Sequence, residues 1–483
     1  MNSADCIALL PLIVPALAAV ALLLLIPVSR NQTVFVLLTL GSLALSFLLL
    51  PVAGKTLPRR VTPLFIMDAY SLFFIGLLLL AGIAVAAMSS RYLRERSAEQ
   101  GEYYVLLLLA TLGASVLAAS SHFASFFAGL EILSVSLYTL ITYRRNDDRG
   151  SEAGLKYLIL AAVSSSFLLF GMALVYAQTG SMDFFQLAER GGAPGLTAVL
   201  SAGLLLIMVG VGFKLAAVPF HFWTPDVYEG APAPVAAFIA TTSKGALFAL
   251  LLRYFSLMDL QRFPAAGYGI AGIAVASMLI GNLLALRQNN LKRLLAYSSI
   301  SHMGYLLVAF LAGGPVAKTA AGYYLAAYFV TVLGAFGVIT FLSGEEGDAE
   351  DLEAFRGMAW RRPWTAGVFV AMLLSLAGIP LTAGFIGKFY VVAAGVGAAL
   401  WIPLIALAVG STIGLYYYLR IVAVLYGRIP EGEGRAAAGF PERAVGVTGG
   451  ILLAVLTFAL LWLGVYPASL IRLLQATVAR FLP

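Results

Sequence analysis

The run GVGFKLAAVPFHFWTPD, residues 210–226, places a lysine and a proline inside a long apolar segment. Pro219 follows Lys214 by five residues. A proline within a helix removes one backbone hydrogen bond and clashes with the preceding turn. In hydrocarbon, backbone groups freed in this way are tolerated only where protein buries them or where they line a watery cavity. The run therefore predicts a broken membrane helix beside a polar pathway.

A second run of the same kind lies nearer the C-terminus. In SLAGIPLTAGFIGKFY, residues 375–390, Pro380 lies among several glycines and precedes Lys388. Two helices interrupted by Gly and Pro at corresponding positions of two halves are the sequence signature of an inverted-repeat transporter.

The composition is that of a polytopic helical membrane protein. Of 483 residues, 61% are hydrophobic and 11% charged, against about 45–50% and about 25% in soluble domains. The apolar stretches are roughly 20 residues long, as a membrane-spanning helix requires, whereas a β-barrel needs shorter alternating segments. We expect about fourteen helices, at 7–26, 33–53, 68–89, 103–120, 122–142, 154–178, 198–222, 232–256, 265–286, 292–312, 318–342, 364–392, 396–426 and 446–464.

The two broken helices divide this series into repeats. They are the seventh and the twelfth, so each is the fourth member of a set of five, helices 4–8 and helices 9–13. Because five is odd, the second set enters the membrane from the opposite face. We predict an all-α membrane fold with a three-helix segment at 1–100, a first five-helix repeat at 101–258, a second, inverted repeat at 262–428 and a C-terminal helix at 440–483.

Basic residues predict the orientation. Alternate loops that include Arg91, Arg144 and Lys292 carry more Lys and Arg than the opposite set, and such loops face the cytoplasm. This places both termini on the outer face of the membrane. The net charge of +7 fits loops that face anionic lipid, and we expect no nucleic-acid partner. The first apolar stretch lacks a basic leader region and is read as a retained helix.

Four ionisable residues lie deep in apolar sequence: Glu131, Lys214, Lys244 and Lys388. A charge at the membrane centre costs at least about 2.5–3.5 kcal/mol, so these positions need a reason. One is that they form buried ion pairs that hold helices together. However, three lysines cannot all pair with one glutamate, and Lys244 is too far from its helix ends to reach water. The pattern favours a functional role.

Proton transfer is the chemistry that suits these residue types. Burial and nearby charges move the pKa values of Lys and Glu in opposite directions, so a Glu131/Lys214 contact that forms and breaks would act as a switch, with Lys244 as the next acceptor. His221 follows the break at Pro219 and either links the lysines to one surface or serves as a structural hydrogen-bonding group. Cys6 is the only cysteine, so a thiolate-held iron–sulfur cluster cannot form within the chain, and no metal site is expected.

Five motifs are spread over most of the chain. They are GFKLAAVPFHFWTPDVYEGAPAPVAAFIATTSKGALF at 212–248, AGLEILSVSLYTL at 128–140, NNLKRLLAYSSISHMGYLLVA at 289–309, LSLAGIPLTAGFIGKFYV at 374–391 and GSTIGLYYYLR at 410–420. These motifs resemble the antiporter-like membrane subunits of the proton-pumping NADH:quinone oxidoreductases, respiratory complex I. Within that family, Pro225-Asp226-Val227-Tyr228 favours the subunit N family, since its siblings tend to read PDAH there.

The resemblance implies roles for these positions and for partners. It places the family's channel glutamate at Glu131 and its channel lysines at Lys214, Lys244 and Lys388; family positions also fall on Lys156, His221 and His302. It further implies that NADH, FMN, iron–sulfur clusters and quinone bind to partner subunits, among which are sibling antiporter-like subunits. This chain alone is then expected to carry no redox chemistry, although the complex is a translocating enzyme.

Two alternatives remain at this stage. One is a subunit of a multi-subunit cation/proton antiporter; sodium prefers oxygen ligands, whereas the deep charges here are mostly lysine. The other is a scaffold whose lysines only bind neighbouring subunits or lipid.

Overall fold

The computed structural model describes residues 2–29, 31–96, 100–144, 147–191, 198–257, 264–345, 347–428 and 445–480. Its helices confirm the predicted all-α membrane fold. Thirteen helices in this part of the chain are long and apolar enough to cross a membrane. Two shorter apolar helices, α17 (Pro363–Ala377) and α18 (Ala383–Gly397), together form the remaining predicted span.

The N-terminal segment consists of three spans and a short hairpin. Its elements are α1 (Ser3–Leu25), α2 (Gln32–Leu48), α3 (Leu50–Gly54), β1 (Arg59–Val61), β2 (Phe65–Met67) and α4 (Ala69–Arg94). The two strands are antiparallel, with Arg60 opposite Ile66. Asp68 caps α4 by accepting a hydrogen bond from the Ser71 backbone N–H.

The predicted first repeat follows, with its fourth span broken. It comprises α5 (Gly101–Ala119), α6 (Phe123–Ile141), α7 (Asp148–Thr179), α8 (Phe184–Gly191), α9 (Ala198–Leu215), α10 (Trp223–Gly230), α11 (Ala233–Phe238), the π-helix η1 (Ile239–Ser243) and α12 (Lys244–Leu257). A buried bidentate ion pair joins this repeat to the N-terminal segment. The guanidinium of Arg253 donates to both Asp68 carboxylate oxygens, at 2.8 and 3.1 Å, and both side chains are at most 1% exposed.

The predicted second repeat follows. It comprises α13 (Pro264–Ala285), α14 (Leu291–Ala312), α15 (Gly314–Leu342), the short turns η3 (Glu353–Phe355) and α16 (Met358–Arg361), α17, α18 and α19 (Trp401–Leu425); α20 (Val447–Val465) and α21 (Ala468–Ala479) complete the chain. The predicted domain boundaries near 258–262 and at 440 lie outside the described residues.

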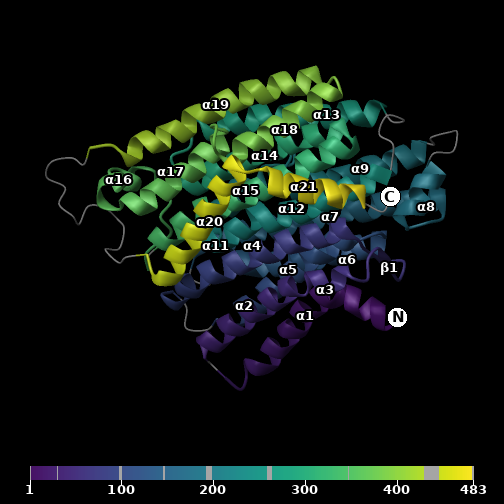
Figure 1. Ribbon diagram of the computed structural model, residues 1–483, viewed down its shortest axis with the longest axis horizontal. Helices are drawn as coiled ribbons and strands as arrows, with labels where there is room; N and C mark the ends of the chain where they lie inside the picture. The colour runs from purple at the N-terminus through teal and green to yellow at the C-terminus, as the bar shows by residue number, and fades with distance from the viewer. Residues whose placement is uncertain are drawn as a thin grey trace.

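The helices form one elongated bundle (Figure 1). In this view α1 and α2 lie along one edge, α13 and α19 lie along the opposite edge, and α20 and α21 cross α15. Both termini lie at the same end. The span 233–254, α14 and α15 are the most enclosed, with 100%, 89% and 94% of their apolar windows buried, compared with 44% for α1. These three spans therefore form the centre of the molecule.

The boundaries differ from the predicted ones where polar residues meet helix ends. Helix α7 begins at Asp148, capped by Asp147, and so extends six residues before the predicted start at 154. Hydropathy misses this turn because it is charged. Helix α9 ends at Leu215, before Pro219, although the apolar run continues to 222.

Candidate functional site

The first break follows Lys214 directly. Helix α9 ends at Leu215, and Ala216 adopts a positive φ of 57°, a conformation that non-glycine residues rarely adopt. The Trp223 indole N–H donates to the Phe213 carbonyl at 3.0 Å. The same carbonyl accepts from the Ala216 backbone N–H at 2.9 Å. The Trp223 side chain therefore adds a hydrogen bond to the last turn of α9, and a buried lysine lies at the end of the interrupted helix.

Lys214 and Glu131 are held by separate serines. The Lys214 ammonium donates to the Ser134 hydroxyl at 2.6 Å and contacts the Tyr157 hydroxyl at 3.5 Å. The Glu131 carboxylate accepts from the Ser165 hydroxyl at 2.7 Å. Ser134 lies one turn beyond Glu131 on α6. Within the described ranges Glu131 and Lys214 form no ion pair, so the contact predicted for the switch is not formed in this structure.

Lys244 lies at the interface between the two repeats. It directly follows the π-helix η1, and π-helical turns inside α-helices are frequent at functional sites. Its ammonium donates to the Ser299 hydroxyl of α14 at 2.6 Å and lies 5.6 Å from the centre of the Tyr228 ring. The Tyr228 hydroxyl also contacts Ser299, at 3.3 Å. Lys244 is 1% exposed, so it has no direct contact with bulk water.

Helix α14 carries further buried polar residues towards the second break. We call them, together with Lys214, Lys244 and Lys388, the polar row. The His302 Nδ1 atom pairs with the Tyr324 hydroxyl at 2.7 Å, and its Nε2 atom lies 3.4 Å from the Tyr418 hydroxyl. Tyr418 in turn pairs with Ser298 at 2.5 Å. Because Ser298, Ser299 and His302 are within about one turn of α14, the groups around Lys244 and those around His302 lie next to each other.

Lys388 occupies the second break. Helix α17 ends at Ala377, Gly378 takes a φ of +84°, and α18 begins at Ala383. The Lys388 ammonium donates to the Ala377 carbonyl at 2.8 Å and to the Ser411 hydroxyl at 2.8 Å. A cation at the C-terminal end of a helix is stabilised by the partial negative charge there. Lys388 therefore compensates for backbone that the break exposes.

Two other predicted residues lie apart from this row. His221 is buried within the first break, with its ring 4.5 Å from that of Phe222. Lys156 is 44% exposed and pairs with Glu152 at 2.6 Å and Asp226 at 2.9 Å. No contact joins either residue to Lys214 or Lys244 in the part of the chain that the structure describes.

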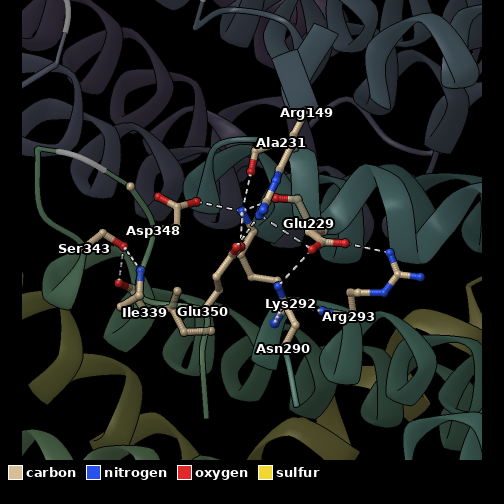
Figure 2. A network of polar contacts seen from close by, with 12 residues as sticks. Arg149, Glu229, Ala231, Asn290, Lys292, Arg293, Ile339, Ser343, Asp348 and Glu350 are labelled. Carbon is tan, nitrogen blue, oxygen red and sulfur yellow. Dashed lines mark hydrogen bonds and ion pairs between the residues drawn. The ribbon is translucent and has the colours of Figure 1, made fainter. Parts of the chain in front are cut away.

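Sequence reasoning missed an ion network beside the row (Figure 2). Lys292, which the sequence pattern predicts as a loop cation, is 1% exposed and pairs with Asp348 at 2.7 Å. Burial raises the pKa of the Asp348 carboxyl, but the Lys292 ammonium and the hydrogen bonds from Lys292 and Tyr92 more than offset this, so its pKa lies below the ordinary value. The sequence feature that could have indicated this network is the acid-rich connection at 344–363, which follows a long apolar helix.

The chain has close relatives of known name. Residues 120–414 match the family model described as NADH:quinone oxidoreductase/Mrp antiporter, TM. NADH-quinone oxidoreductase subunit N of Nitrosospira multiformis is 53% identical, over 98% of this chain and 96% of that protein. A chain of respiratory complex I from Thermus thermophilus is 35% identical, with a TM-score of 0.82 over 96% of this chain and 98% of its own length.

A more distant structure shares the fold. A chain of the Mrp complex from Dietzia sp. is 21% identical and superposes with a TM-score of 0.86 over 99% of this chain and 97% of its own length. That likeness concerns the fold alone. The family model and the full-length relative at 53% identity show that the chain belongs to the NADH:quinone oxidoreductase/Mrp antiporter membrane subunits, in the group of NADH-quinone oxidoreductase subunit N.

Proposed function

We propose that this chain is the proton-translocating N subunit of a bacterial NADH:quinone oxidoreductase, and that Glu131, Lys214, Lys244 and Lys388 carry the protons. Relatives that match nearly the whole chain bear the name of that subunit. The chain is a multi-pass membrane protein, and its partners are the other membrane subunits of the complex, including antiporter-like siblings.

One observation supports the residue assignment above the others. Lys214, Lys244 and Lys388 are 4%, 1% and 9% exposed, and each ammonium donates to a hydroxyl or a carbonyl. Among the residues that the structure describes, none of the three has a carboxylate within ion-pair distance. Helix glue would need paired charges. Buried lysines without counter-charges suit groups that take up and release protons.

The contacts suggest an order of transfer. Glu131 and Lys214 lie in the first repeat, Lys244 and Ser299 join the repeats, and His302 leads towards Lys388 in the second. Serine and tyrosine hydroxyls both donate and accept hydrogen bonds, so they can relay a proton between these groups. His221 and Lys156 are secondary relay candidates, between the first break and the charged end of α7.

The redox chemistry belongs to partner subunits in this proposal. NADH, FMN, iron–sulfur clusters and quinone would bind there and supply the driving reaction, while this chain moves protons. Both termini would face the periplasm, because the basic loops would face the cytoplasm; the position of both termini at one end of the bundle fits the part of this proposal that puts them on the same side. A cation/proton antiporter is the weaker alternative, because the similarity to the Mrp chain is limited to the fold.

Replacing Lys214 with Ala tests the proposal. In the assembled complex, Lys214→Ala should lower quinone reduction coupled to proton transport and leave electron transfer from NADH to an artificial acceptor near the wild-type rate. The reason is that the acceptor takes electrons upstream of the membrane subunits. Equal losses of both activities in a fully assembled complex would contradict the assignment.

A further inference from the structure

The C-terminal end of α10 depends on a side chain from the other repeat. Helix α10 ends at Gly230, and Pro232 and Pro234 follow. Neither proline has a backbone N–H with which to continue the helical pattern. The Lys292 ammonium of α14 donates to the carbonyls of Glu229 and Ala231, both at 2.7 Å. Lys292 thus binds two carbonyls where the chain leaves α10 ahead of these prolines, at the end of a helix where a cation is favoured.

The third hydrogen bond of Lys292 goes to the connection between α15 and α17. Asp348 accepts it at 2.7 Å, and Asp348 also accepts from the Tyr92 hydroxyl of α4 at 2.8 Å. Figure 2 shows the Lys292 side chain between the Ala231 carbonyl and Asp348. The side chains of Lys292 and Asp348 are 2% and 4% exposed. Since an ammonium has three hydrogens, this geometry uses all of them.

The same two helices meet again at Lys244. Tyr228 of α10 precedes Glu229, and its hydroxyl contacts Ser299, which also binds the Lys244 ammonium. Ser299 lies seven residues after Lys292 on α14, on the same side and about 10 Å along the helix. Helix α10 is therefore attached to α14 at Lys292, at Arg293, which pairs with Asp226 at 2.8 Å and Glu229 at 2.6 Å, and beside Lys244. Because Tyr228 directly precedes Glu229, a shift of the α10 end at Lys292 is transmitted to Tyr228 along the same helix.

A polar cavity gives water access to the attachment at Lys292. It has a volume of about 350 Å³ and is lined by Glu229, Lys292, Asp348 and further charged residues. The ion pair between Lys292 and Asp348 is thus enclosed on the helix side and borders polar surroundings on the other. A change in the loop that carries Asp348 reaches Lys292 without crossing the apolar core.

We propose that Lys292 and Asp348 are positioning residues for proton transfer through Lys244. They hold α10 so that the Tyr228 hydroxyl and Ser299 stay in contact beside the Lys244 ammonium, and they make this arrangement depend on the α15–α17 connection. The inference rests on the proposed role of Lys244. It adds Lys292, Asp348 and the α15–α17 connection to the parts of the chain on which the proposed proton path depends.

The test uses the intact complex in sealed vesicles. Asp348→Asn keeps the size of the side chain and removes the charge that orients Lys292. We expect the rate of NADH-driven proton pumping to fall by about 2- to 30-fold, which corresponds to the roughly 0.5–2 kcal/mol found for mutations along coupled networks. Electron transfer to an artificial acceptor should be unchanged. Glu353→Gln is the matched control, because its pair with Arg356 lies in the same connection but is exposed.

A double variant separates positioning from simple stabilisation. If Asp348 acts through Tyr228, then Asp348→Asn combined with Tyr228→Phe should lose no more pumping than the more impaired single variant. Losses that multiply would overturn the inference. Tyr92→Phe removes only the second hydrogen bond to Asp348 and should give a smaller loss of the same sign, which provides a milder variant if Asp348→Asn assembles poorly.

The outcomes distinguish this inference from the proposed function. Normal pumping by Lys244→Ala would refute the proposed function and the inference together. Loss of pumping in Lys244→Ala with normal pumping in both Asp348→Asn and Tyr92→Phe would refute the positioning role alone. Loss in all three, without a loss in Glu353→Gln, would support both.

Discussion

Arginine at position 244 is the substitution that best separates a proton carrier from a fixed charge. Lysine can lose its proton in a dry site, whereas arginine keeps its proton under all physiological conditions. Lys244→Arg preserves the positive charge and the approximate length of the side chain. If Lys244 carries protons, the arginine variant should be nearly as impaired as Lys244→Ala. If it is only a structural cation, arginine should substitute well.

The surroundings of Lys244 set the size of the effect. A positioned acid–base group typically contributes about 100- to 10,000-fold to the rate of proton transfer, and both variants remove that contribution. Arginine has five N–H donors instead of three, while Ser299 provides a single hydroxyl to the ammonium at 2.6 Å. Each buried donor left without an acceptor costs about 1–3 kcal/mol. We therefore also expect some loss of stability in the arginine variant.

Quinone-driven acidification of sealed vesicles measures the outcome at matched subunit content. Lys55→Arg is a suitable control, because Lys55 is exposed beyond the end of α3. The control should pump normally. Near-normal pumping by Lys244→Arg, in the same preparation in which Lys244→Ala fails, would remove Lys244 from the proton carriers and leave it a structural cation.

Three further predictions concern stability, packing and topology. The pKa of Asp348 is lowered in the folded protein. Its ion pair therefore stabilises the fold above the unfolded pKa of about 4, and this stabilisation is lost as the pH falls through the folded pKa. Asp348→Asn should lower the melting temperature at pH 7, and the difference in melting temperature from wild type should shrink in acid. A difference that grows in acid would reverse this reasoning. Gly384→Ala would place a Cβ 1.9 Å from the Ser375 carbonyl oxygen and should destabilise the second break by about 1–3 kcal/mol, whereas Gly367→Ala, with open space around it, should melt like wild type. A cysteine added after Pro483 in a Cys6→Ser background should react only with reagent on the periplasmic side; labelling from the cytoplasm would refute the proposed orientation.

Hydrophobicity made the fold predictable from the sequence. Spans of about 20 apolar residues have one stable form in a bilayer, and Pro219 and Pro380 marked both breaks. The deep lysines were found for a related reason, because a charge inside such a span is costly. The structure confirms their burial, while their part in proton transfer stays a prediction.

Contacts between distant segments were not predictable in this way. Serines such as Ser134 and Ser165 are common in membrane helices and carry no charge signal, so nothing in the sequence shows which of them faces a lysine. Lys292 and Asp348 lie at the edges of apolar spans, where the sequence pattern cannot distinguish an exposed loop charge from a buried pair. Only the packing of α10, α14 and the connection after α15 brings them together.

The ion pair between Asp68 and Arg253 also constrains how the protein is made. Its partners are 185 residues apart in the chain. At about 5–20 residues per second, the ribosome needs roughly 10–40 s to reach Arg253 after Asp68 has been synthesised. During that time Asp68 lacks the cation that neutralises it in the finished protein. This contact therefore closes only after the chain has been synthesised through Arg253, so assembly at this joint involves late docking and does not follow strict chain order.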